Sequence, residues 1–329
     1  MPIKRVLATS LTITALAVLA GPALAQSPKV WRHGMVEAKS DAGIVMMPGQ
    51  GGFAEKRGLK IEYLQFKGDA LALKALIAGE LDSYEGSPGG PMIAASRSAD
   101  VKIVGCYWPG LTYGIFVGKD VTKVEDLKGK TFAISAPGSL PDLFARTVLE
   151  TYKIPISDVK FAAMGSDADR FRSVSAGIVQ AAAASTEFTP LVEKQGIRML
   201  LHAHDVAPNY IRFCTYMSSK TIKEHGAEAT GFLAAQMEGF KYALSHRDET
   251  IKLAKQVTDA KPEDEKAAYV FDEVTKYSAV DPLMPIPREK LAWMKDLLVR
   301  TENLTAPLDI EKMIDGSVRE KALAAIGAK

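Results

Sequence analysis

Two acidic residues of this 329-residue chain, Glu85 and Glu187, stand in turns where a carboxylate could meet a ligand. Glu85 ends a short β-rich run and precedes the sequence GSPGG, and Glu187 follows the apolar run 178–185. A carboxylate accepts hydrogen bonds from ligand N–H groups or pairs with a ligand cation. Acting across one cleft, two carboxylates favour a neutral or cationic nitrogen-bearing solute, because a carboxylate within about 6 Å repels an anion.

Glu85 also has a structural interpretation that the sequence leaves open. In that interpretation it complements the dipole of the helix that follows, or pairs with Lys67 or Arg97. The charge of the ligand stays open as well, because free helix N-termini alone favour an anion such as a sulfonate or carboxylate. The cations that could reverse the argument for a cationic ligand are Arg32, His33, Lys67 and Arg212.

Four strand-to-helix junctions are rich in small and polar residues, at 66–69, 85–90, 135–141 and 164–167. Ser87 and Ser139 can cap the helices that follow them, and the glycines beside them let a ligand approach the backbone. In open α/β sheets, ligands gather outside the carboxyl ends of the strands. The alternative is that each junction is an ordinary capped turn, and four such junctions in one chain favour a ligand site.

The patterns typical of enzymes and metal sites are incomplete. The dinucleotide-like sequence at 49–54 is followed by Gly58, which leaves too short a helix for the pyrophosphate. The S-x-x-K match at 157–160 has no companion motifs. His202 and His204 have no third ligand nearby, which favours a surface or capping role over metal binding. We therefore expect a protein that is not an enzyme, with no catalytic residues, no cofactor and no metal.

The order of secondary-structure patterns predicts an α/β protein with a helical C-terminal tail. From residue 29 to about 212, β-rich runs alternate with helix-like runs, which indicates largely parallel sheet. After about 218, the segments 223–257, 263–277, 288–301 and 310–325 all look like amphipathic helices. Strand-like runs at 113–118 and 210–218 predict two crossings between two lobes. The expected first lobe is 26–117 and 215–329, and the expected second lobe is 118–214.

The N-terminus predicts export. Lys4 and Arg5 precede an apolar run of about 15 residues, and Ala23-Leu24-Ala25 forms a small-x-small cleavage site. This predicts a signal peptide at 1–25, cleaved between Ala25 and Gln26, and a periplasmic product. The alternative, a membrane anchor, needs roughly 20 apolar residues. The formal charge of +2, from 41 basic and 39 acidic residues, does not favour nucleic acid or anionic lipid as a partner.

Cys106 and Cys214 are the only cysteines. An oxidising compartment allows them to form one disulfide. Each lies in an apolar strand-like run, however, so two small buried thiols are the expectation that we favour.

Four pieces of the sequence, taken in order, resemble one family of transport proteins. They are 52–59 (GFAEKRGL), 75–82 (ALIAGELD), 86–88 (GSP) and 124–130 (VEDLKGK). The chain thereby resembles the periplasmic solute-binding proteins of ABC importers for nitrate, sulfonates, taurine and thiamine precursors. The resemblance implies a type II periplasmic binding protein, a monomer whose two lobes, joined by two crossing hinge strands, close on a small solute. The solute then passes to an ABC permease of the inner membrane, without membrane insertion of this protein or contact with nucleic acid.

The resemblance also implies a set of ligand-binding residues. The family's pocket turns correspond to 35–40, 67–69, 85–87, 107–113, 136–139 and 185–190. The residues expected to contact the solute are Lys67, Asp69, Glu85, Ser87, Trp108, Tyr113, Gly138, Ser139 and Glu187. Trp108 and Tyr113 could stack on a planar ligand or simply pack within the lobes.

Two stretches depart from the family pattern. Many relatives have Trp-Glu-Pro where this chain has TEFTP at 186–190, so the acid is kept and the preceding aromatic is missing. The stretch 43–53 differs from the family's "APLYVAKEKGFF", which predicts a displaced or shortened helix.

Two rival functions remain. The family also resembles a pyrimidine-forming enzyme of thiamine synthesis, which uses a pyridoxal-linked lysine, a histidine and a cysteine-rich motif. The signal peptide and the two scattered cysteines favour transport over that enzyme. A receptor for another transporter type or for a sensor kinase is the other alternative.

Overall fold

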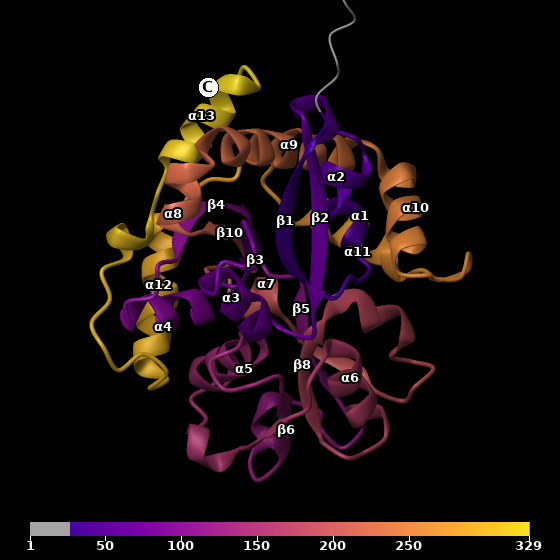
Figure 1. Cartoon of the computed structure of the whole chain (residues 1–329). Helices are drawn as coiled ribbons and strands as arrows, with labels where there is room; N and C mark the ends of the chain where they lie inside the picture. Colours follow the sequence, from indigo (N-terminus) through magenta and orange to yellow (C-terminus); the bar gives the residue numbers. More distant parts are fainter. Residues whose placement is uncertain (1–26, 329) are drawn as a thin grey trace, which may run out of the picture.

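Two separate five-stranded sheets define the fold of residues 27–328, the part of the chain that the computed structural model describes. Each sheet belongs to one lobe, and the lobes lie one above the other in Figure 1. This confirms the predicted two-lobed α/β class. The predicted signal peptide and its cleavage site lie outside the described residues.

The first sheet mixes parallel and antiparallel strands. Its centre and one edge are parallel, with β1 between β2 and β3, and β10 pairs antiparallel with both β3 and β4. Strand β4 reads as a continuous apolar run and is buried along nearly its whole length, as expected for a strand covered on both faces. In spatial order the strands are β2 (Leu59–Phe66), β1 (Lys29–Val36), β3 (Ser83–Gly86), β10 (Phe213–Met217) and β4 (Lys102–Trp108).

The second sheet repeats this plan. Strand β6 pairs parallel with β7 and β8, and β5 pairs antiparallel with β8 and β9. In spatial order the strands are β7 (Lys160–Ala163), β6 (Thr131–Ile134), β8 (Ala181–Ser185), β5 (Tyr113–Val117) and β9 (Arg198–His202). The chain therefore changes sheet before Tyr113 and again before Phe213, a few residues earlier than the breaks expected after 117 and 214.

The helices cover the sheets and extend the first lobe toward the C-terminus. The second lobe carries α5 (Leu140–Thr151), α6 (Asp167–Ser175) and α7 (Ala203–Val206), and the 3₁₀ turns Val124–Leu127, Ile156–Asp158 and Thr186–Leu191. The remaining helices and 3₁₀ turns are α1 (Ala42–Val45), α2 (Met47–Gln50), α3 (Asp69–Ile77), α4 (Gly89–Ser96), α8 (Ser219–Glu224), α9 (Gly226–Ser245), α10 (Arg247–Val257), α11 (Lys266–Lys276), α12 (Arg288–Arg300), α13 (Ser317–Ala325), Glu55–Arg57 and Ile310–Met313. The helical C-terminal region is confirmed. None of the described helices combines the length and the apolar character needed to cross a bilayer.

The shortened helix expected near residues 43–53 is present as two four-residue helices, α1 and α2. Helix α1 packs closely against α10, and α2 packs closely against α9, and each contact contains a glycine. A methyl group added at Gly43 would lie 1.9 Å from the carbonyl oxygen of Thr250, and one added at Gly239 would lie 2.7 Å from Cα of Pro48. Only glycine allows these backbones to approach so closely.

The two cysteines form a disulfide, so the expectation of two free thiols was wrong. Cys106 lies on β4 and Cys214 on β10, which are hydrogen-bonded neighbours in the first sheet. Returning from the second lobe, the chain brings these residues together across a sequence separation of 108.

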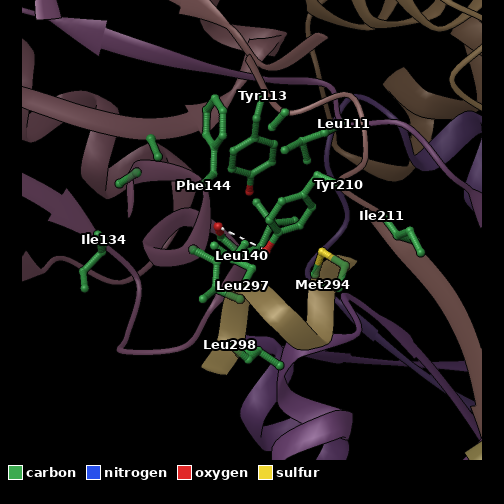
Figure 2. Packing of buried hydrophobic residues seen from close by; sticks show 14 of the residues in the cluster. Leu111, Tyr113, Ile134, Leu140, Phe144, Tyr210, Ile211, Met294, Leu297 and Leu298 are labelled. Atoms are coloured by element: carbon green, nitrogen blue, oxygen red, sulfur yellow. Dashed lines mark hydrogen bonds between the residues drawn. The ribbon is translucent and has the colours of Figure 1, made fainter. Parts of the chain in front are cut away.

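A hydrophobic cluster joins the lobes where the chain crosses between them. Figure 2 shows Tyr113, the first residue of β5, and Tyr210, in the second crossing segment, packed beside Phe144 of α5 and Leu297 of α12. The hydroxyl of Tyr210 donates a hydrogen bond of 3.5 Å to the carbonyl oxygen of Leu140. Since α12 is part of the C-terminal region and α5 is part of the second lobe, the tail ties the two lobes together at the crossing.

Candidate functional site

A cavity of about 770 Å³ lies between the two lobes, a volume in the range of small-molecule sites. The first lobe lines it with the turn after β1 (36–40) and the start of α3 (67–71). The second lobe lines it with 135–136, 139–141, the start of α6 (165–168 with Arg170) and 187–188. Residues at 258–261, 264 and 266–267 complete one side.

An ion pair between Lys39 and Asp167 crosses this cavity from one lobe to the other. Burial alone would lower the pKa of Lys39, but the effects of Asp167, Tyr113 and Asp41 together outweigh burial and raise it. Conversely, burial would raise the pKa of Asp167, and Lys39 together with Arg170 lowers it. Tyr113 donates a further hydrogen bond of 2.7 Å to Asp167. Both charges of the pair are thus held in place.

The guanidinium of Arg170 is paired with groups of its own lobe, the second one. Its guanidinium pairs with Asp167, three residues earlier on α6, and its Nε donates a 2.8 Å hydrogen bond to the carbonyl oxygen of Ala183. Its side chain is almost fully buried. The Asp167 carboxylate is therefore paired with two cations, Lys39 of the first lobe and Arg170 of the second.

Arg212 is the last residue before β10, at the end of the second crossing segment, and its side chain is buried. It pairs with Asp41 and donates a 2.6 Å hydrogen bond to Oγ1 of Thr112. Its guanidinium lies 4.4 Å from the ring centre of Trp108 and 4.7 Å from that of Phe213. Burial lowers the pKa of Arg212, but Asp41 together with Tyr113, Asp167 and Tyr107 outweighs that effect and the pKa is raised.

Glu187 reaches from the second lobe toward the turn after β1. Its side chain is buried, and its Oε2 accepts a 3.0 Å hydrogen bond from the backbone N–H of Ser40. Burial raises the pKa of Glu187, and Lys39 opposes the rise in part. Glu187 forms no ion pair with any of the described residues.

Asp69 is the first residue of α3 and faces the cavity from the first lobe. Burial raises its pKa to about 6, against the opposing effect of Lys39. Its Oδ1 is buried beside the hydroxyl of Tyr84, which lowers the pKa of Asp69, and its Oδ2 accepts no hydrogen bond from residues 27–328. Asp69 is thus a carboxylate that the protein itself leaves incompletely satisfied.

The structure divides the predicted site residues into two groups. Lys67, Asp69, Tyr113, Ser139 and Glu187 line the cavity. The others lie outside its lining, and these are Glu85, Ser87, Trp108 and Gly138.

Glu85 is buried within the first lobe, away from the cavity. It accepts a 2.6 Å hydrogen bond from the hydroxyl of Tyr107, and its Oε2 lies 3.3 Å from Nε2 of His33. These partners replace Lys67 and Arg97, the expected ones. Glu85 lies inside β3 rather than beyond its end, so its side chain points to a face of the sheet.

The expected serine caps do not form. Pro88, not Ser87, is the N-cap residue of α4, and the Oγ of Ser87 is buried beside the hydroxyl of Tyr210. Ser139 stands at the N-cap of α5, but its hydroxyl donates back to the carbonyl oxygen of Ala136 at 2.6 Å. His202, in contrast, does cap α7, where its Nδ1 accepts a 3.0 Å hydrogen bond from the N–H of His204.

The main residues that sequence reasoning missed are the charged groups Lys39, Asp167 and Arg170. Lys39 lay within the turn 35–40 and Asp167 within the junction 164–167, but neither was singled out. The signal for Asp167 was its place in the first turn of a helix after Ser166, whose side chain accepts a hydrogen bond from the N–H of Asp169. Among the described residues, no three His, Cys, Asp or Glu side chains form a group that could hold a metal ion.

Residues 41–250 match the family described as NMT1/THI5 like. The chain belongs to this family. A putative aliphatic sulfonates-binding protein of Bacillus subtilis is 25% identical to it over 281 residues, which cover 82% of this chain and 80% of that protein.

Solved structures share the fold of this NMT1/THI5-like protein. The periplasmic aliphatic sulphonate binding protein SsuA from Escherichia coli has a TM-score of 0.72 at 21% identity, covering 89% of this chain and 100% of that one. The periplasmic nitrate-binding protein NrtA from Synechocystis PCC 6803 has a TM-score of 0.75 at 15% identity, covering 91% of this chain and 89% of that one. The predicted periplasmic binding protein fold is therefore confirmed.

Proposed function

We propose that this protein captures a small polar organic solute in the cleft between its lobes and delivers it to an ABC permease of the inner membrane. The observation that carries the proposal is the cavity of about 770 Å³, which both lobes line. Contacts such as Lys39 with Asp167 and Ser40 with Glu187 join its facing walls, as expected for lobes that close over a ligand. The relatives named above as sulfonate-binding and nitrate-binding proteins support the same role.

Binding without chemistry fits the composition of the cavity wall. The residues that line the cavity include neither histidine nor cysteine. A pyrimidine-forming enzyme of the kind considered above would use both. We propose that the protein is a periplasmic receptor and not an enzyme, and that it acts as a monomer.

A ligand screen that includes a blocked cavity tests this function. The mature protein is screened by thermal shift against a broad panel of small solutes, since a ligand that binds only the folded state raises the melting temperature by mass action. Ala136→Trp places an indole in the cavity wall and should abolish the shift, whereas Ala227→Trp, on the exposed start of α9, should not. If no solute binds, or if Ala136→Trp binds as well as wild type, the proposed function is wrong.

A further inference from the structure

The cations Lys39, Arg170 and Arg212 of the cleft are each already in an ion pair with a carboxylate of the protein. Lys39 and Arg170 share the carboxylate of Asp167, and Arg212 pairs with Asp41. An incoming anion would therefore compete with Asp167 or Asp41 for these cations. Breaking a buried pair leaves an uncompensated charge, which is strongly unfavourable.

Two carboxylates of the cleft form no such ion pair. Neither Asp69 nor Glu187 forms an ion pair with another residue of the 27–328 region. Glu187 is only 5% exposed, and a single one of its oxygens accepts a hydrogen bond, from Ser40. The Oδ1 of Asp69 is buried beside the hydroxyl of Tyr84, whereas its Oδ2 accepts no hydrogen bond from the described part of the chain. These two groups come from opposite walls, since Asp69 starts α3 of the first lobe and Glu187 belongs to the second.

We infer, on the basis of the proposed function, that the ligand carries a cationic nitrogen with N–H groups, which Asp69 and Glu187 receive from the two walls of the cleft. An ammonium, amidinium or guanidinium group would give each carboxylate the charge-assisted hydrogen bond that it lacks. The ligand would thus differ in charge from the sulfonates and nitrate for which the relatives are named.

The rest of the cavity wall indicates the chemical character of the ligand that carries this nitrogen. Phe188, Phe213 and Leu140 line the cavity and are largely buried, so they offer an apolar surface. The charges at the rim are exposed and balanced, with Lys67 and Lys261 against Glu37 and Asp259. Exposed charges interact weakly in water, so the rim does not reverse the preference set by the buried groups. A compact amine with an apolar part fits this wall.

A matched panel of ligands separates this inference from the proposed function. The panel presents the same carbon skeletons with opposite charges, such as benzamidine against benzenesulfonate and benzoate, and alkylamines against alkanesulfonates and carboxylates. Binding to the wild-type protein is measured by thermal shift and then by titration calorimetry. Asp69→Asn and Glu187→Gln remove one negative charge each at nearly constant shape. Glu62→Gln, an exposed carboxylate on β2 outside the cavity lining, is the control.

We expect the cationic members to bind and their matched anions not to bind. Each of the two cleft variants should weaken that binding by about tenfold or more, the usual cost of losing a charge-assisted hydrogen bond, and Glu62→Gln should leave it unchanged. Binding of anions only would overturn the inference while the proposed function stood. Cation binding that survives both variants would overturn it as well. Binding of no member at all would contradict the proposed function and the inference together.

Discussion

Asp69 gives the unliganded protein a pH-dependent stability. Its pKa is about 6 in the folded protein because burial disfavours the charged form, while the same group titrates near 4 in an unfolded chain. Between these values the folded state binds more protons than the unfolded state. The free energy of unfolding therefore falls as the pH rises from about 4 to about 6. The charged and titratable groups that act on Asp69 are Lys39, Tyr84, Glu85 and Asp167.

Replacing this carboxylate should therefore stabilise the unliganded protein. We expect Asp69→Asn to raise the free energy of unfolding at pH 7.5 by about 1–3 kcal/mol, which corresponds to a shift of one to two pKa units. Urea unfolding at pH 7.5 and at pH 4 measures the effect, and the gain should vanish at the lower pH. Glu62→Gln serves as the control at both pH values. An equal gain at both would show that the pKa of Asp69 is not raised.

Whether a residue predicted from the sequence lines the cavity depends on where it lies in its element. Lys67, Ser139 and Glu187 line the cavity because they follow strands, where the turns of an α/β fold face the cleft. Glu85 and Trp108 lie inside β3 and β4, so their side chains point to the faces of the sheet and are buried there. The fate of such a side chain depends on what packs on that face, which the sequence does not reveal.

At the scale of elements, the sequence predicted the strands and helices but not every pairing between them. The alternation of patterns is local, so the α/β class and the C-terminal helices could be recognised. The insertion of β10 between β3 and β4 joins segments more than a hundred residues apart, and no local pattern records it. The disulfide between Cys106 and Cys214 was missed for this reason.

That disulfide should stabilise the fold substantially, because it closes a loop of more than a hundred residues in the unfolded chain. We expect the double variant Cys106→Ala, Cys214→Ala to lose about 2–5 kcal/mol of unfolding free energy. Urea unfolding measures the loss, with wild type treated with a reductant as a parallel sample. Thiol titration of the denatured, unreduced protein provides an independent test. Two reactive thiols in protein purified from the periplasm would contradict the pairing.

At the scale of the whole molecule, α11 supplies a polar contact between the lobes outside the cavity. Glu273 of this helix is buried, accepts a hydrogen bond from the hydroxyl of Thr186 and contacts Nε2 of His202. Thr186 and His202 belong to the second lobe. Glu273 therefore favours the arrangement in which the lobes are close.

Removing this contact should shift the population toward open lobes. We expect Glu273→Ala to increase the radius of gyration of the unliganded protein, measured by small-angle scattering, and to weaken ligand binding, because the competent state becomes less populated. Saturating ligand should restore the compact form. Glu263→Ala, an exposed position before the same helix, is the control. An unchanged radius together with unchanged affinity would show that Glu273 does not act on closure.

The hydrophobic cluster at the crossing bears on the heat-capacity change that calorimetry measures when the ligand binds. Because Tyr210 belongs to the second crossing segment and Tyr113 stands where the first one ends, we expect the contacts of this cluster to persist as the lobes pivot (Figure 2). The surfaces that meet on closing are instead polar, as Lys39, Asp167 and Glu187 show. Burial of apolar surface lowers the heat capacity and burial of polar surface raises it. Closing of the lobes should accordingly not lower the heat capacity, and a decrease on binding should come instead from the apolar part of the solute packed on Phe188, Phe213 and Leu140.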